Sequence, residues 1–292
     1  MTLIVTTDFT LNKVAAPNLP KAPAQYNAQY QEQLNNVLRL YFNRLDNFIQ
    51  QLSSNEIAAK LVLPYGAFHQ NGATTLSSNI TNVSTTPIQV AGTSGFPSSG
   101  WLLIGSELIS YTTKTATTFD GTITRGVLGT TNVAHTAGAA ITEAQGTGGA
   151  TTIGKVLFNN TDYSNGVSAD IADETKIVFT DAGIYNLQLS AQLLNFTTTE
   201  DNVTIWLRKN GSDVSASAGI VEVAPKHGTS PGAYIAAWNY LLDVSSGDYV
   251  QLAWTSDTGN TVLASFPAGT SPVHPLSPGV IFTATFVSAV PA

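Results

Sequence analysis

Between residues 25 and 60 the apolar positions recur at helical spacing, in a stretch without Pro or Gly. Six of them follow one another at intervals of 4, 3, 4, 3 and 4 residues: Leu34, Leu38, Tyr41, Leu45, Phe48 and Leu52. This alternation is the a/d pattern of a heptad repeat, which buries a narrow apolar seam against partner helices. It predicts a coiled-coil-like helical stem over residues 25–60, with these six residues as oligomerisation contacts.

The same spacing also fits an ordinary amphipathic helix packed on its own domain, because the repeat is short. Two features favour self-association. Val37 and Ile49 widen the apolar stripe beyond a two-stranded seam, and the aromatic residues Tyr41 and Phe48 need more space than a tight dimer gives. We therefore expect a helical trimer and keep the self-packed helix as the alternative.

The segment before the helix has a different character. Pro17, Pro20 and Pro23 exclude a regular helix and favour an extended chain over residues 1–24. The apolar run Leu3-Ile4-Val5 is able to add a short strand to the sheet edge of a partner. We interpret residues 1–24 as an attachment arm, the alternative being a frayed terminus.

The pattern changes to short apolar runs separated by turn residues after residue 60. Residues 61–145 read as a small β-domain with a tight hairpin at Gly105-Ser106. The Gly-rich residues 146–152 are interpreted as a flexible linker. Residues 153–292 alternate strands with turns, including the strong hairpin signal Asn210-Gly211. The fold class is therefore mainly β, with a C-terminal antiparallel sandwich, most simply a jelly roll.

Composition narrows the function classes. The formal net charge of −7 argues against nucleic-acid binding, because Lys and Arg supply that affinity. No apolar run approaches the roughly 20 residues that cross a bilayer, so no membrane span is expected. The first residues lack the features of a signal peptide, so we expect synthesis in a cytoplasm. With no Cys, disulfides and thiolate zinc sites are excluded.

Candidate chemistry is sparse. His69, His135, His227 and His274 lie in Gly-, Pro- or Thr-rich segments and lack metal-ligand spacing, so we interpret them as loop residues. The 19 acidic residues are scattered, and a pair such as Glu200-Asp201 reads as a loop. Phosphate-loop, dinucleotide and nucleophile-elbow motifs are missing. We expect no catalytic, cofactor or metal site and a protein that is not an enzyme.

Aromatic residues and two polar loops are the candidate binding features of the sequence. Trp101, Trp206, Trp238 and Trp254 lie in predicted strands with apolar neighbours, so core packing is favoured over sugar stacking. Residues 226–232 and 267–278 are polar loops on a rigid sandwich. Recognition, if any, is expected there, because such loops tolerate variation.

Three segments in order carry a family resemblance: FTDAGIYNLQLSAQL, VTIWLRKNGSDV and LLDVSSGDYVQLAW, followed by GVIFTATFV at the end. Together they resemble the jelly roll of tumour necrosis factor and of the globular complement-type head, over roughly the last 140 residues. The resemblance implies a compact homotrimer with aromatic residues of the first and last strands near the three-fold axis. Tyr185, Phe282 and Phe286 are the candidates for those positions.

Two upstream segments resemble structural proteins of marine and cyanobacterial phages. They are QLNNVLRLYFNRLDNFIQQL and GFPSSGWLLIGSELISYTTKTATTFDGTITRGVLGTTNVAHTAGAAI. The resemblance implies a virion protein made in the cytoplasm of a bacterial host: a tail fibre, spike, head fibre or capsid decoration subunit. Its arm would then bind other virion proteins of the tail or capsid. The alternative function is a lectin-like receptor-binding adhesin for host surface glycans.

Overall fold

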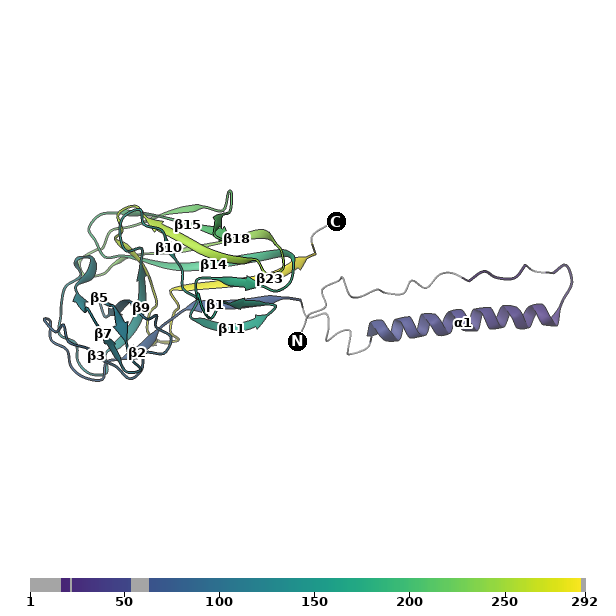
Figure 1. The fold of residues 1–292 in the computed structure, drawn as a ribbon, viewed down its shortest axis with the longest axis horizontal. Helices are drawn as coiled ribbons and strands as arrows, with labels where there is room; N and C mark the ends of the chain where they lie inside the picture. The colour runs from purple at the N-terminus through teal and green to yellow at the C-terminus, as the bar shows by residue number, and fades with distance from the viewer. Residues whose placement is uncertain (1–16, 22, 54–62, 290–292) are drawn as a thin grey trace. The chain divides into compact units, whose positions relative to one another are not determined.

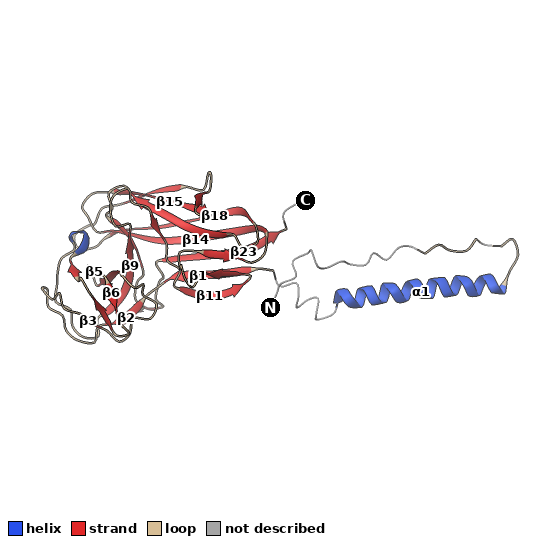
Figure 2. Ribbon diagram, viewed as in Figure 1, coloured by secondary structure: helices blue, strands red, loops and turns tan. Residues whose placement is uncertain are grey.

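The computed structural model describes residues 17–21, 23–53 and 63–289. The chain divides into two compact units, Met1–Leu63 and Pro64–Ala292. The first unit contains the helix α1 (Ala28–Ser53) and the second consists of β-strands (Figures 1 and 2). The mainly β fold class expected from the sequence is confirmed.

Helix α1 begins where its first turn is capped. The side-chain oxygen of Asn27 accepts hydrogen bonds from the backbone N–H groups of Gln29 (2.9 Å) and Tyr30 (3.3 Å), which satisfies donors that have no partner within a helix. The helix then runs without interruption through the predicted heptads. Residues 17–21, which belong to the predicted arm, form no helix or strand.

The β unit contains a sandwich of two antiparallel sheets (Figure 2). The order of the first sheet is β11 (Asn160–Asn165), β1 (Tyr65–Gln70), β23 (Val280–Ser288), β14 (Gly183–Asn195) and β18 (Gly232–Val244). The order of the second is β12 (Val167–Ala169), β13 (Ile177–Phe179), β19 (Tyr249–Ser256), β15 (Asp201–Lys209) and β17 (Gly219–Val223), with β10 (Gly154–Lys155) on β19 and β16 (Ser212–Asp213) on β15. The predicted antiparallel jelly-roll sandwich is confirmed.

Strand alternation explains why this sandwich forms. In β14 every odd-numbered residue from Gly183 to Leu193 is buried, while the even-numbered residues up to Gln192 face outward. The turn between β15 and β16 is the predicted Asn210-Gly211, and both residues have positive φ, 50° and 81°. That conformation is the one an Asn-Gly hairpin supplies at low cost.

The first sheet continues from β14 through β20 (Thr261–Ala264) into a small β-domain beside the sandwich. There it is built on β9 (Ala140–Gly146), which pairs with β2 (Ala73–Thr75) and β4 (Gly100–Ile104), and it ends with β5 (Glu107–Tyr111) and β8 (Thr124–Arg125). A second sheet holds β3 (Ile88–Gln89), β7 (Thr118–Asp120) and β6 (Thr113–Lys114). The short helix η1 (Val127–Gly129) follows β8. The Gly105-Ser106 hairpin joins β4 and β5 as predicted.

Domain organisation differs from the sequence-derived boundaries of 61–145, 146–152 and 153–292. Strand β1 lies upstream of the small β-domain, yet it pairs with β11 and β23 of the sandwich. The small β-domain is therefore an insertion between two sandwich strands. The expected linker is also held in place: Gly146 pairs with Val262 in β20 (Thr261–Ala264), and the N–H of Thr151 bonds the carbonyl of Ser256.

One further hairpin, β21 (Gly269–Thr270) with β22 (Val273–His274), lies in the loop that leads from β20 to β23.

Candidate functional site

The predicted seam of α1 lies on a helix that has no buried side chain among those the structure describes. Leu34, Leu38, Tyr41, Leu45 and Phe48 are half-buried, and Leu52 belongs to the helix although its side chain lies outside the described part. Neighbouring apolar side chains are more exposed: Leu40 at 57%, Phe42 at 59% and Ile49 at 50%. Within the described part of its own unit, the helix thus presents an apolar stripe that is partly exposed.

The described part of the arm contacts another side of the helix. Asn18, Leu19 and Pro20 line a groove of about 500 Å³ together with Gln33, Asn36 and Val37. None of the six seam residues lines this groove. The described residues of the arm that line this groove therefore lie away from the six seam residues.

The three aromatic residues expected near a three-fold axis are buried within the sandwich of their own chain. Tyr185, Phe282 and Phe286 are 0%, 1% and 7% exposed, inside the sandwich. Tyr185 packs edge-on against Phe286, with ring centroids 5.4 Å apart. Their role in the chain is core packing. The resemblance placed the aromatic strands correctly in sequence, but side chains alternate between faces, and these three occupy the inward set.

The outward set on the same strands forms a different surface. Three rows cross β23, β14 and β18, and they contain only apolar or uncharged polar residues: Ile281, Ser190 and Ala237; Thr283, Gln188 and Asn239; Thr285, Asn186 and Leu241. Within and beside these rows, Ile235, Leu241, Ile281 and Val287 are 64%, 67%, 43% and 53% exposed. We call this the outer face. The sequence analysis did not identify this face. The signal was present in the residues that alternate with the buried ones along β14, β18 and β23, because those in the three rows are uncharged.

The predicted recognition loop 267–278 borders a cleft of about 680 Å³. Phe266, His274 and Leu276 line it together with Gln192 of β14. The Gln192 side chain donates hydrogen bonds to the Ser277 hydroxyl (2.7 Å) and to the Pro278 carbonyl (2.6 Å), which ties the loop to the sheet. The loop therefore forms a concave surface with aromatic and aliphatic walls.

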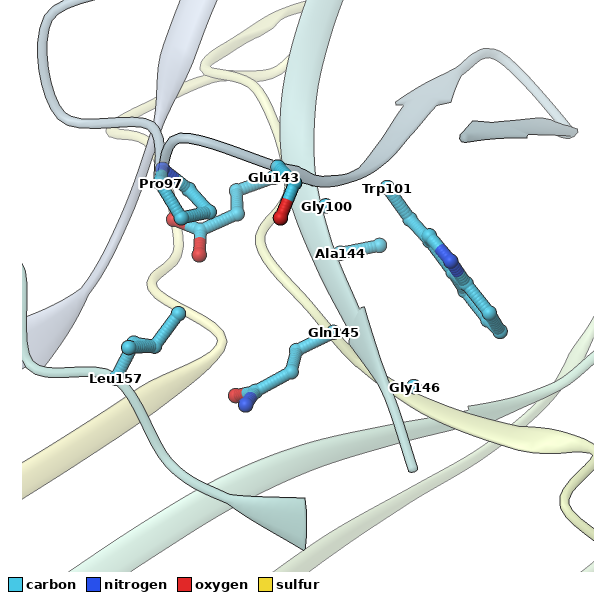
Figure 3. Close-up of a pocket in the computed structure, with 9 residues that line it drawn as sticks. Pro97, Gly100, Trp101, Glu143, Ala144, Gln145, Gly146 and Leu157 are labelled. Atoms are coloured by element: carbon cyan, nitrogen blue, oxygen red, sulfur yellow. The ribbon is translucent and has the colours of Figure 1, made fainter. Parts of the chain in front are cut away.

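A second pocket, of about 180 Å³, lies beside β9 (Figure 3). Glu143 and Gln145 are two residues apart on this strand, so their side chains share one face, and Pro97 and Leu157 form apolar walls. Trp101 lies on the other side of the strand, because it pairs with Ala144, and its ring packs on Gly146 (Figure 3). A Cβ at Gly146 would stand 2.4 Å from that ring, so this contact requires glycine.

Glu143 is the polar centre of this pocket. It is 1% exposed, and its two carboxylate oxygens accept hydrogen bonds from the side-chain amides of Gln70 (3.1 Å) and Asn159 (2.6 Å). Burial, the largest effect, raises the pKa of Glu143 to about 7, against the lowering effect of these hydrogen bonds. Gln70 belongs to β1, so the network also joins the small β-domain to the sandwich.

A buried ion pair lies elsewhere in the small β-domain. Glu107 accepts hydrogen bonds from Arg125 at 2.6 and 2.7 Å, and its Oε2 lies 2.8 Å from the His135 ring. Burial alone would raise the pKa of Glu107, but the hydrogen bonds from Arg125 and His135 outweigh it and hold the pKa below its usual value. His135 is therefore not a free loop residue. His69 and His274 also differ from that expectation, because His69 lies in β1 and pairs with Asp162 at 3.1 Å, and His274 lies in β22.

Asp201 anchors a turn of the sandwich rather than a catalytic pair. It is buried and accepts hydrogen bonds from the hydroxyls of Ser256 (2.5 Å) and Thr261 (2.6 Å) and from the N–H of Thr258 (3.0 Å). Burial acts to raise the pKa of Asp201, but these bonds dominate and lower it. Its sequence neighbour Glu200 is exposed.

Of the four tryptophans, Trp254 is fully buried, whereas Trp101, Trp206 and Trp238 are half-buried. Within the described ranges, no group of three or more His, Asp or Glu side chains is arranged to hold a metal ion. No described helix combines the length and the hydropathy that crossing a membrane requires.

Comparisons with known proteins give limited information. No protein-family model matches the sequence, and neither does any curated protein. Among solved structures, murine APRIL at pH 5.0 is similar at 12% identity and a TM-score of 0.31, covering 46% of this chain and 88% of that one. Murine APRIL at pH 8.5 is similar at 13% identity and a TM-score of 0.30, covering 50% and 92%. A likeness this weak says nothing about the function of this chain.

Proposed function

We propose that this protein is a structural subunit of a bacteriophage virion that assembles as a homotrimer. The observation that carries the proposal is the partly exposed apolar stripe of α1: within the described part of its unit, the seam residues Leu34, Leu38, Tyr41, Leu45 and Phe48 are half-buried and none is fully buried. Apolar surface left in water is unfavourable, at about 25 cal/mol per Å². Association of identical helices would remove it.

The width of the stripe favours three helices over two. If Leu38 and Leu45 occupy a positions, Phe42 and Ile49 fall at e positions, and both are at least half exposed. In two-stranded coiled coils the e and g positions are usually charged and lie at the rim. Large apolar side chains at e widen the stripe, so that it can pack against two neighbouring helices. In a trimer each helix has two such neighbours.

The outer face of the sandwich is compatible with the same assembly. Its central rows contain no charged side chain and combine Leu241 and Ile281 with amides and hydroxyls. Burying these rows would desolvate no ion, a step that otherwise costs several kcal/mol for each charge. Two separate surfaces of the chain are thus suited to self-association.

The virion location rests on the sequence resemblance of residues 33–52 and 95–141 to phage structural proteins. Residues 33–52 lie in α1 and residues 95–141 lie in the small β-domain. In this proposal the arm, residues 1–24, binds other proteins of the tail or capsid, and the β unit projects from that anchor. The role is mechanical and not enzymatic.

Two measurements test the proposal. Light scattering coupled to size exclusion should give three times the chain mass of 30.7 kDa for the purified protein. A mass of one or two chains at micromolar concentration would contradict the trimer. Immunogold labelling of purified phage particles should mark a fixed position on the tail or head, and unlabelled particles would contradict the virion location.

The second candidate function is a receptor-binding adhesin for host surface glycans. The cleft of about 680 Å³ at the 267–278 loop favours it, because Phe266 and His274 offer rings and Gln192, whose amide N–H₂ already bonds Ser277 and Pro278, offers its amide oxygen as an acceptor. Sugars are commonly bound by stacking on rings and by hydrogen bonds to amides. A glycan array probed with the wild-type chain and with His274→Ala would separate an adhesin from a purely structural subunit.

A further inference from the structure

The two buried glutamates of the small β-domain differ in their partners. Glu107 is 0% exposed and is neutralised by Arg125. Glu143 is almost as deeply buried, at 1%, but no ion pair in the described part of the chain includes it. A buried charge is costly unless a charge of opposite sign or several hydrogen bonds compensate it.

Neutral groups satisfy only part of the Glu143 carboxylate. The carboxylate accepts amide N–H groups from Gln70 and Asn159 and a backbone hydrogen bond at Gly72, whereas an ionised carboxylate offers about four acceptor positions. The charge that acts on Glu143 comes from Glu174. Because both carboxylates are negative, Glu174 raises the pKa of Glu143 further. Glu143 lines the 180 Å³ pocket of Figure 3.

Gln145 adds a second acceptor to the pocket. Its side-chain N–H₂ donates to the backbone carbonyl of Lys155, which fixes the amide orientation, because a carbonyl cannot donate. The amide oxygen of Gln145 is buried and has no hydrogen-bond partner in the described part of the chain. The pocket therefore combines a carboxylate and an unpaired amide oxygen with the apolar walls Pro97 and Leu157 (Figure 3).

We propose that this pocket binds a primary ammonium group carried on a short aliphatic stem, with Glu143 and Gln145 as its acceptors. An ammonium group has three N–H donors and no acceptor, which matches a site that offers acceptors and lacks a cation. The stem would lie between Pro97 and Leu157. At roughly 30 Å³ per water molecule the pocket has room for about six waters, enough for a four-carbon amine but not for a long peptide.

The titration of Glu143 agrees with this geometry. Its pKa of about 7 means that the empty pocket holds the carboxyl partly protonated near neutral pH, and a bound cation would favour the charged form. Among the other titratable groups that interact with it, Glu174 disfavours the charge, and Tyr111 has a pKa that burial and Glu143 both raise. The net charge of −7 would assist the approach of a cation.

The same ammonium chemistry occurs in three sources: a free aliphatic amine, a lysine side chain of another protein, and an amino sugar. The test therefore uses n-butylamine and N-acetyl-lysine methylamide, titrated calorimetrically into the full chain at pH 8, and D-glucosamine, titrated at pH 7 because its amine is less basic and is only partly protonated at pH 8. The neutral partners 1-butanol and D-glucose are the controls. The amine that binds most tightly identifies the source.

We expect at least one amine to bind and its neutral partner to bind more than about tenfold less tightly. Leu157→Trp should abolish binding by filling the pocket, whereas Leu276→Trp, in the other cleft, should not. Because alkylamines stay protonated between pH 5.5 and 8, affinity should fall by more than about tenfold at pH 5.5 as Glu143 protonates.

Three results would overturn the proposal. The first is that each amine binds no more tightly than its neutral partner, or that no amine binds at all. The second is unchanged binding by a folded Leu157→Trp variant. The third is saturable binding of calcium chloride that displaces the amine, because the site would then be a metal site. None of these results depends on trimer formation, so the proposal stands or fails independently of the virion role.

Discussion

The guanidinium of Arg125 and the carboxylate of Glu107 form a two-point ion pair in the interior of the small β-domain, at 2.6 and 2.7 Å. The same guanidinium donates to the backbone carbonyls of Thr81 and Val133, both at 2.6 Å. One side chain thus connects β8 with β5 and with two loops. The buried guanidinium charge of Arg125 is thus compensated both by a carboxylate and by backbone hydrogen bonds.

Arg125→Ala should therefore destabilise the protein strongly. Removing one partner leaves Glu107 buried without its countercharge, which costs about 3–5 kcal/mol. Arg208→Ala is the matched control, because Arg208 pairs with Asp213 at 2.9 Å but both side chains are partly exposed, and its loss should cost about 0–1 kcal/mol. Urea unfolding at fixed protein concentration measures both. Equal losses of unfolding free energy for the two variants would mean that the buried pair stabilises the protein no more than the exposed pair does.

Local patterns in the sequence predicted the elements that depend on neighbours along the chain. The heptad spacing predicted α1, and Asn210-Gly211 predicted the turn between β15 and β16, because each signal lies within a few residues. The insertion of the small β-domain was not predictable in this way. It depends on the pairing of Gln70 with Val280, two residues at opposite ends of the β unit.

The candidate sites show the same division. Tyr185 and Phe282 were recognised as important strand residues, but the face they occupy follows from the register of β14 with β23. Glu143 gave no signal in the sequence, because its partners Gln70 and Asn159 are 73 and 16 residues away. Its burial results from three distant segments meeting, which no local pattern records.

The free energy of unfolding should fall as pH rises from 5 to 8, because of Glu143. The carboxyl has a pKa of about 7 in the folded chain and an ordinary value of 4.5 when unfolded. Between these values the folded chain binds the proton more tightly, so its stability is highest at low pH and is lost as pH rises through 7. The difference amounts to about 3 kcal/mol.

Glu143→Gln should remove this slope. Comparing the two proteins in the same buffers cancels every titrating group they share, so the difference between their slopes reports Glu143 alone. Glu107 and Asp201 have lowered pKa values and lose their stabilising effect only at more acidic pH, outside this window. Parallel slopes for wild type and variant would show that Glu143 is not buried as a carboxyl.

Phe282 and its neighbour Ile281 should respond differently to truncation. Phe282 is 1% exposed inside the sandwich, so Phe282→Ala should cost about 3–5 kcal/mol through lost burial and a cavity. Ile281 is 43% exposed on the outer face, so Ile281→Ala should cost less than about 1 kcal/mol in a monomer. Chemical unfolding below the association concentration measures both. A small loss for Phe282→Ala would place that ring outside the core.

The double variant Leu38→Asp and Leu45→Asp should separate the chains. Each charge would enter the seam, where burying it unpaired costs several kcal/mol. Asn43→Asp with Asn47→Asp is the matched control, since it adds the same charges at exposed positions of the same helix. Light scattering should give the mass of one chain for the first variant and of three for the second. Equal masses would show that the seam is not an interface.

The last prediction concerns the outer face. Leu241→Lys places a charge in a surface whose central rows have none, so it should weaken association by at least about tenfold if that surface is buried between subunits. Val83→Lys is the control, because Val83 is 76% exposed in the small β-domain, against 67% for Leu241. Dilution series in analytical ultracentrifugation, with unfolding curves as the check on folding, compare the two. If Leu241→Lys associates as tightly as Val83→Lys, the helix alone holds the chains together and the outer face must be assigned another partner.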